Sequence, residues 1–226
     1  MARDERGRGV YDWWSGHQRL FGVLSTLLLF GKGDDARARG VTSLALDPGD
    51  TVLDVGCGPG VNFPALREAV GPDGTVVGLD YSAGMCHRAR KRVRKAGWEN
   101  VHVVRGDAAR PPFETPFDAA YATLSMTAMP EATAVIDAVY DSLRPGGRFV
   151  VVDTRPIQDA PWDRLNPLFT PISRLATNWL PDVDVVGALR DTFETYSLTE
   201  YNGGTLYVAT ATREDGRAAD TTPLQE

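Results

Sequence analysis

The chain has 226 residues, enough for one α/β domain with appendages and too few for a second full domain. Its formal net charge of −6 disfavours a protein that binds by neutralising phosphates, so we expect no nucleic-acid partner. The two cysteines, Cys57 and Cys86, have no second cysteine or histidine at metal-ligand spacing, so we expect neither a disulfide framework nor a metal site.

Near the N-terminus, an apolar run extends from Leu20 to Phe30 without a small-residue cleavage site. The run is shorter than the roughly 20 residues that a membrane-spanning helix needs. We therefore expect no signal peptide and no transmembrane segment, and we place the protein in the cytoplasm.

Beyond residue 45, strand patterns alternate with helix patterns, which is typical of a largely parallel sheet with helices on both faces. The expected strands are 51–55, 75–79, 101–105, 119–124 and 148–153, with helices at 62–70, 82–96 and 131–143, and an antiparallel pair at 192–201 and 205–212 closes the sheet.

The first strand runs into the glycine turn Asp54-Val55-Gly56-Cys57-Gly58-Pro59-Gly60. Glycine tolerates positive φ and has no Cβ, so this turn can reverse sharply and leave N–H groups exposed to a flat cofactor. Asp80 ends the second strand about 20 residues later, where nucleotide-binding α/β folds place the carboxylate that holds a ribose. Together these features predict a nucleoside site.

The glycine spacing disfavours a dinucleotide cofactor. The G-x-G-x-x-G fingerprint needs its third glycine where this chain has Val61, or Phe63 when the count starts at Gly58. An NAD-dependent oxidoreductase is therefore the less favoured interpretation.

The pattern D-x-G-x-G-x-G, formed by Asp54, Gly56, Gly58 and Gly60, resembles the first motif of the class I S-adenosylmethionine-dependent methyltransferases. The resemblance covers residues 45–153. It implies a Rossmann-like, seven-stranded, mostly parallel sheet with an antiparallel last strand, S-adenosyl-L-methionine as cofactor and S-adenosyl-L-homocysteine as product. The cofactor contacts that it implies in the core are Asp54, Gly56, Cys57, Gly58, Gly60, Asn62, Asp80, Tyr81, Ser82, Met85, Gly106, Asp107, Ala108, Thr123 and Leu124.

Within that family, Asp107 stands where an acid contacts the adenine amino group, although an acid that caps the following turn is the alternative interpretation. Cys57 is interpreted as a small residue that fills the turn. His87 and His102 are interpreted as structural.

The resemblance also implies a domain organisation. Residues 1–44 are expected to form a helical cap over the cofactor site, residues 45–213 the S-adenosylmethionine-binding domain with an apolar lid at 155–190, and residues 214–226 a polar tail. In the cap, Tyr11 and Trp14 are candidates for closing over the cofactor. His17 and Tyr11 are the candidates for a catalytic base.

The methyl acceptor is less constrained by the sequence. The segment Thr123–Pro130, where the methyl group is expected to meet its acceptor, shows no acid or base. Gly60–Pro64 resembles the G-x-N-x-P continuation of bacterial phosphatidylethanolamine N-methyltransferases, and the start at Tyr11-Asp12 resembles both these enzymes and the quinone-biosynthesis methyltransferases.

The hypothesis is methyl transfer to a small apolar or lipid-like acceptor, either a quinone precursor or a phospholipid headgroup. The apolar lid and the Leu20–Phe30 run would then meet the inner face of the membrane peripherally. A methyltransferase of a polar metabolite and a non-catalytic S-adenosylmethionine-binding protein remain open, as does the oligomeric state.

Overall fold

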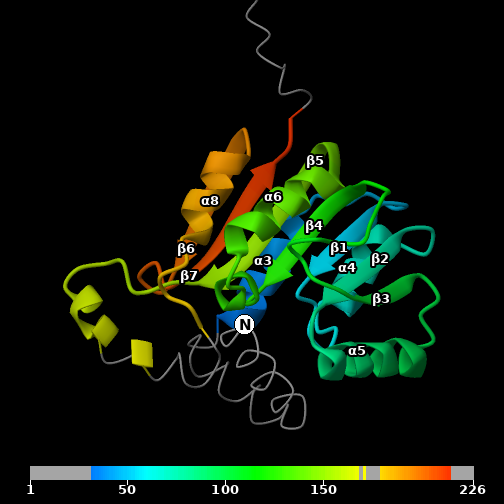
Figure 1. Cartoon of the computed structure of the whole chain (residues 1–226), viewed down its shortest axis with the longest axis horizontal. Coiled ribbons are helices and arrows are strands. Elements are labelled where there is room, and N and C mark those ends of the chain that lie inside the picture. Colours follow the sequence, from blue (N-terminus) through cyan, green and yellow to red (C-terminus); the bar gives the residue numbers. More distant parts are fainter. Residues whose placement is uncertain (1–31, 168–169, 172–178, 215–226) are drawn as a thin grey trace, which may run out of the picture.

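In the computed structural model, which describes residues 32–167, 170–171 and 179–214, seven strands form one sheet in the order β3-β2-β1-β4-β5-β7-β6 (Figure 1). The strands are β1 (Thr51–Val55), β2 (Thr75–Asp80), β3 (Val101–Arg105), β4 (Phe117–Thr123), β5 (Leu143–Thr154), β6 (Thr195–Tyr201) and β7 (Leu206–Thr212). Strands β1 to β5 are parallel, and β7 lies antiparallel between β5 and β6. The expected mixed seven-stranded fold is confirmed.

Helices cover both faces of this sheet and bury two apolar layers. On one face lie α3 (Gly33–Ser43), α4 (Phe63–Val70) and α5 (Ala83–Ala96), which pack through residues such as Ala36, Phe63, Leu66 and Ala89. On the other lie α6 (Ala132–Ser142) and α8 (Val185–Thr192), which pack through Ile136, Val139 and Leu189. Two short 3-10 helices, η1 (Met126–Ala128) and η2 (Trp162–Leu165), complete the described elements.

Local chemistry explains the best-predicted helix boundary. The Ser82 hydroxyl accepts a hydrogen bond from the Met85 N–H at 3.2 Å and so caps α5, as its position before the helix predicts. The same helix ends at Gly97, whose φ of +67° is the left-handed conformation that glycine adopts without strain.

Two segments differ from the sequence-based expectation. Strand β5 begins at Leu143, which pairs with Phe117, and the register then shifts so that Arg148 pairs with Ala119; the expected turn before residue 148 is an irregularity within this strand. The end of the expected lid at 155–190 falls in α8, whose buried Val185 and Leu189 pack on the sheet.

The chain order reverses between β1 and β4, because the chain moves outward from β1 to β3 and then returns to the other side of β1. In open α/β sheets, ligands bind in the crevice at the carboxyl ends of the strands at this switch point. None of the described helices is long and apolar enough to cross a membrane.

Candidate functional site

A cavity of about 670 Å³ opens at the switch point, next to the glycine turn between β1 and α4. It brings together most of the predicted cofactor contacts, which are Gly56, Cys57, Gly58, Asn62, Asp80, Tyr81, Ser82, Met85, Gly106, Asp107, Ala108, Thr123 and Leu124. These residues come from the segments that follow the four strands β1, β2, β3 and β4, so only the folded sheet assembles them.

The glycine turn is held in place by Asp80. Gly58 N–H donates to one Asp80 carboxylate oxygen at 2.8 Å, and Ser82 N–H donates to the other at 2.8 Å. Gly58 has a φ of +54°, and a Cβ added to it would meet no protein atom within 4 Å. Its bare side therefore opens into space that a flat ligand can fill.

At Gly56, in contrast, neighbouring side chains leave no room for a Cβ atom. A Cβ at this position would lie 2.7 Å from the Ser125 Cβ and 2.9 Å from the Met129 Cε. Gly56 therefore allows the loop after β4 to approach the end of β1, where the Ser125 hydroxyl donates to the Val55 carbonyl at 2.9 Å.

Asp107 follows β3 and lines the same cavity as Asp80. One of its carboxylate oxygens accepts the Ala109 N–H at 3.0 Å, so the acid does cap the turn that follows it. A carboxylate has further lone pairs, and its contact with an adenine amino group stays a prediction.

Asp54 and Gly60 lie behind the cavity wall rather than on it. The Asp54 side chain is fully buried, and Asn62 Nδ2 donates to its two oxygens at 3.0 and 3.3 Å and to the Thr123 hydroxyl at 3.1 Å. Burial raises the pKa of Asp54 from 3.8 to about 7, against the opposing effect of the Asn62 hydrogen bonds. A Cβ at Gly60 would lie 2.5 Å from the Phe63 ring.

The far wall of the cavity is built by the loop after β4 and the start of α6. Its apolar surface comes from Leu124, Ala128, Met129 and Val135. The loop is anchored by the buried Asp153, which accepts the Thr127 N–H at 3.0 Å and the Thr127 hydroxyl at 2.7 Å.

Sequence reasoning missed three charged residues of this cavity, one of which is Arg110, in the connection after β3. Glu131, at the start of α6, lines the wall and lies one residue beyond the segment Thr123–Pro130, which contains no acid. Arg37, on α3, also lines the cavity. No local pattern pointed to Arg37, since its contact with Tyr121 spans 84 residues of chain.

Tyr11, Trp14 and His17 lie outside the described residues, so their roles stay predictions. His87 and His102 are exposed on α5 and β3 and do not line the cavity. Burial raises the pKa of the Cys57 thiol well above its ordinary range, which agrees with a turn-filling residue rather than a nucleophile.

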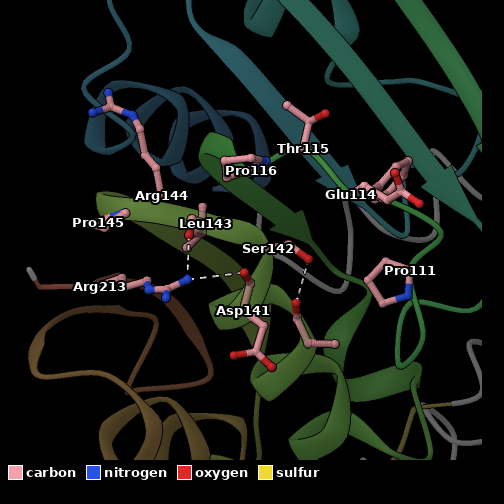
Figure 2. A pocket seen from close by; sticks show the side chains of 12 residues that line it. Pro111, Glu114, Thr115, Pro116, Asp141, Ser142, Leu143, Arg144, Pro145 and Arg213 are labelled. Atoms are coloured by element: carbon pink, nitrogen blue, oxygen red, sulfur yellow. Dashed lines mark hydrogen bonds between the residues drawn. The ribbon is translucent and has the colours of Figure 1, made fainter. Parts of the chain in front are cut away.

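A second cavity, of about 550 Å³, lies at the opposite end of the sheet, beside the amino ends of β4 and β5 (Figure 2). The two arginines that line it, Arg144 and Arg213, already interact with other groups of the protein. Arg213 donates to the carbonyls of Tyr140, Asp141 and Leu143 at 2.9, 3.2 and 2.6 Å, and Arg144 pairs with Asp118. Arg213 thus satisfies carbonyls at the end of α6, and we place the functional site in the first cavity.

Residues 52–147 match the family described as a methyltransferase domain. Among curated relatives, the demethylmenaquinone methyltransferase of Anoxybacillus flavithermus is 29% identical over 155 residues, or 68% of this chain and 64% of that protein. The arsenite methyltransferase of Halobacterium salinarum is 36% identical over 119 residues, or 52% of this chain and 30% of that protein. The chain thus spans less than two thirds of the length of these relatives.

Solved structures show the same fold at low identity. An S-adenosylmethionine-dependent methyltransferase from Aquifex aeolicus superimposes with a TM-score of 0.59 at 20% identity, covering 78% of this chain and 88% of that one. The [4+2]-cyclase SpnF superimposes with a TM-score of 0.65 at 19% identity, covering 81% of each chain. The similarity to these structures therefore shows the fold alone, and the function has to be argued from the residues of the site.

Proposed function

We propose that this chain, whose residues 52–147 form a class I methyltransferase domain that takes S-adenosylmethionine, transfers a methyl group to a small apolar acceptor. The acceptor that we propose is a quinone precursor or a phospholipid headgroup, reached at a membrane surface. The observation that carries the proposal is one continuous cavity, with Asp80 and Asp107 on one side and an apolar wall around Ala128 and Met129 on the other.

The residues of the cavity fit the cofactor. Gly58 leaves open space where any side chain would project, so an adenosyl group can lie on bare backbone. Asp80 stands beside it, and a carboxylate there can accept from the ribose hydroxyls while it keeps its backbone partners. A bound cofactor would be held by these groups at the β1 and β2 ends.

The sulfonium of the cofactor supplies an already activated methyl group. The task left to the chain is to bind the two reactants in line and to exclude water from between them. Holding two reactants in a reactive geometry can supply about 7 to 11 kcal/mol of a barrier. The loop from Leu124 to Met129, anchored through Asp153 and Ser125, is a rigid surface of this kind.

The apolar character of the far wall supports an apolar acceptor. Leu124, Met129 and Val135 offer no hydrogen bonds from their side chains, so a polar group placed against these three residues would lose its water without compensation. The names of the demethylmenaquinone methyltransferases to which the chain is similar support a quinone precursor in particular.

The proposal is tested by incubating the protein with methyl-tritiated S-adenosylmethionine and one of three acceptors. These are a demethylated naphthoquinol in detergent, vesicles that contain phosphatidylethanolamine, and a water-soluble metabolite extract. We expect label in an organic-solvent product from the quinol or from the vesicles. A variant that no longer binds S-adenosylhomocysteine is the control for enzymatic transfer.

Label found only in water-soluble products would contradict an apolar acceptor and favour a polar metabolite. If no acceptor takes up label although S-adenosylhomocysteine binds, the chain is a binding protein rather than an enzyme. Sedimentation with the vesicles, compared with vesicles of neutral lipid alone, tests the proposed peripheral membrane contact.

A further inference from the structure

Helix α5 carries a concentration of positive charge. Six of its 14 residues are lysine or arginine and none is acidic, although the whole chain has a formal net charge of −6. Within the described part of the chain, only Arg90 among these cations has a partner, since it donates to the Val103 carbonyl at 3.1 Å. The five cations that make no hydrogen bond or ion pair there are Arg88, Lys91, Arg92, Arg94 and Lys95.

The charges face away from the sheet. Cys86 and Ala89 are buried on the inner side of α5. At 3.6 residues per turn, the exposed Lys91, Arg94 and Lys95 stand on the opposite side of the helix, and these three residues are called the basic face below. Helix α5 packs on β2 and β3, at the end of the sheet that β3 closes (Figure 1).

The basic face has an energetic cost for the helix itself. Lys91 lies three residues before Arg94 and four before Lys95, and like charges at these spacings repel each other on a helix surface. The helix dipole favours Arg94 and Lys95 in the last turn, but it falls off before Lys91. The first acid after the helix is Glu99, which lies beyond the Gly97 cap. An anionic partner would replace this repulsion with attraction.

The same helix begins at the functional cavity. Ser82, which caps α5, and Met85, in its first turn, both line the cavity. The helix is about 21 Å long, at 1.5 Å per residue. A surface that binds along the outer side of α5 would therefore lie beside the cavity that receives the acceptor.

Two observations favour a lipid surface over a nucleic acid as the anionic partner. The far wall of the cavity is apolar around Leu124 and Met129, which suits a lipid-like acceptor better than a nucleobase with its many hydrogen-bonding groups. In addition, α5 contains no phenylalanine, tyrosine or tryptophan on which an unpaired base could stack.

We propose that the basic face of α5 binds the protein to an anionic phospholipid surface, beside the cavity that receives the acceptor. The inference rests on the proposed function, because it assumes an acceptor that is dissolved in a membrane. The negative charge of the whole chain does not prevent this binding, since the Debye length is about 8 Å at physiological ionic strength and charges on other faces are screened.

The test measures co-sedimentation of the full chain with vesicles in the absence of any acceptor. Vesicles of phosphatidylcholine alone are compared with vesicles of phosphatidylcholine mixed with phosphatidylglycerol. We expect binding to the mixed vesicles only. It should weaken as salt is raised from about 0.01 to about 0.15 M, because the Debye length shortens from about 30 to about 8 Å.

The variant that tests the basic face combines Lys91→Gln, Arg94→Gln and Lys95→Gln. Each lysine or arginine near an anionic bilayer strengthens binding about fivefold, so this variant should bind the mixed vesicles about a hundredfold more weakly. A second variant combines Lys91→Arg, Arg94→Lys and Lys95→Arg. It keeps every charge and should bind like the wild-type protein.

The matched control removes the same charge elsewhere, through Lys32→Gln, Arg39→Gln and Arg148→Gln combined. These three side chains are exposed, lie outside α5 and do not line the cavity, so their loss should change vesicle binding little. Thermal unfolding checks that the variants are folded. If the triple glutamine variant of α5 is not, Lys91→Gln alone carries the test, with an expected loss of about fivefold.

Equal binding to vesicles of phosphatidylcholine alone would overturn the inference, because the charge of the surface would then not matter. An equal loss of binding in the control variant would overturn it too. Tighter binding to polyuridylate RNA than to the mixed vesicles would assign the basic face to a nucleic acid instead.

The proposed function can fail separately. Methyl transfer to a quinol in detergent needs no bilayer, so the triple glutamine variant of α5 should match the wild-type protein in that assay. Vesicle binding without transfer to any acceptor would contradict the proposed function and keep the lipid-binding face. Transfer in detergent without vesicle binding would contradict the lipid-binding face alone.

Discussion

Asn62 donates hydrogen bonds to both carboxylate oxygens of the buried Asp54, at 3.0 and 3.3 Å, and thereby joins the end of β1 to the start of α4. The same amide nitrogen reaches the Thr123 hydroxyl at the end of β4. Asn62 and Thr123 line the cavity and Asp54 lies behind them, so the protonation state of Asp54 is expected to affect both the stability of the fold and the shape of the site.

The first prediction concerns the effect of pH on Asp54. Its folded-state pKa of about 7 lies above its ordinary value of 3.8, so between these values the folded protein keeps a proton that the unfolded chain has lost. The free energy of unfolding should therefore fall as pH rises through this window, by at most about 1.4 kcal/mol per pH unit.

Asp54→Asn should lack this slope. The measurement is urea unfolding of both proteins from pH 4 to 7.5. Burial also raises the pKa of Asp153, so the quantity to examine is the difference between the two curves. Parallel curves would show that Asp54 does not hold the proton.

The second prediction concerns Asp80. Asp80→Ala removes the predicted ribose contact and also the acceptor of the Gly58 and Ser82 N–H groups, so the glycine turn loses its anchor. Affinity for S-adenosylhomocysteine should fall by about 1.5 to 3 kcal/mol or more, as expected for hydrogen bonds to a charged group.

Calorimetry measures this loss, with Asp73→Ala as the control, since Asp73 is exposed in the turn before β2. An unchanged affinity in Asp80→Ala would refute the assigned role.

The third prediction uses two glycines with similar backbones. A Cβ added to Gly58 (φ +54°) or to Gly97 (φ +67°) would meet no protein atom within 4 Å, yet of these two only Gly58 lines the cavity. Leucine at either position should cost about 1 to 2 kcal/mol of stability, because both backbones are left-handed.

Only Gly58→Leu should also abolish binding of S-adenosylhomocysteine, because its side chain would occupy the ligand space. Unfolding and binding are measured on both variants. If Gly58→Leu binds like Gly97→Leu, the cofactor does not lie against this turn.

The fourth prediction concerns the acceptor wall. Ala128→Glu places a charge among Leu124, Met129 and Val135, and it should raise the KM for an apolar acceptor while the affinity for S-adenosylhomocysteine changes little. Ala134→Glu is the matched control, since Ala134 is exposed on α6 and does not line the cavity. Steady-state kinetics with the labelled cofactor measures the KM of both variants for the acceptor. A KM that rises equally in Ala128→Glu and Ala134→Glu would contradict an apolar wall at Ala128.

Much of the nucleotide side of the site is local in sequence and was therefore predictable. Gly58 needs positive φ, Asp80 ends a buried strand, and Ser82 caps the helix that follows. Each of these requirements is met by a few neighbouring residues, and parallel strands bring their carboxyl ends to one edge. Their folded positions agree with that prediction.

The boundaries of β5 and of the expected lid were less predictable. The residues from Arg144 to Gly147 have the composition of a turn, but the pairing of Leu143 with Phe117 keeps them within the strand. Similarly, Val185 and Leu189 are apolar in a segment expected to cover a ligand, and only packing against α6 and the sheet identifies their helix as part of the core.

The amino-acid sequence by itself determined the α/β fold, the glycine turn and the pair Asp80 and Asp107, because strand alternation, φ preferences and caps act over short distances along the chain. Only the tertiary structure decided that Asp54 is buried behind the wall, that Glu131 lines it, and that Arg37 reaches the cavity from α3. Burial and contact between distant segments depend on how the helices pack on the sheet, and no short pattern encodes that packing.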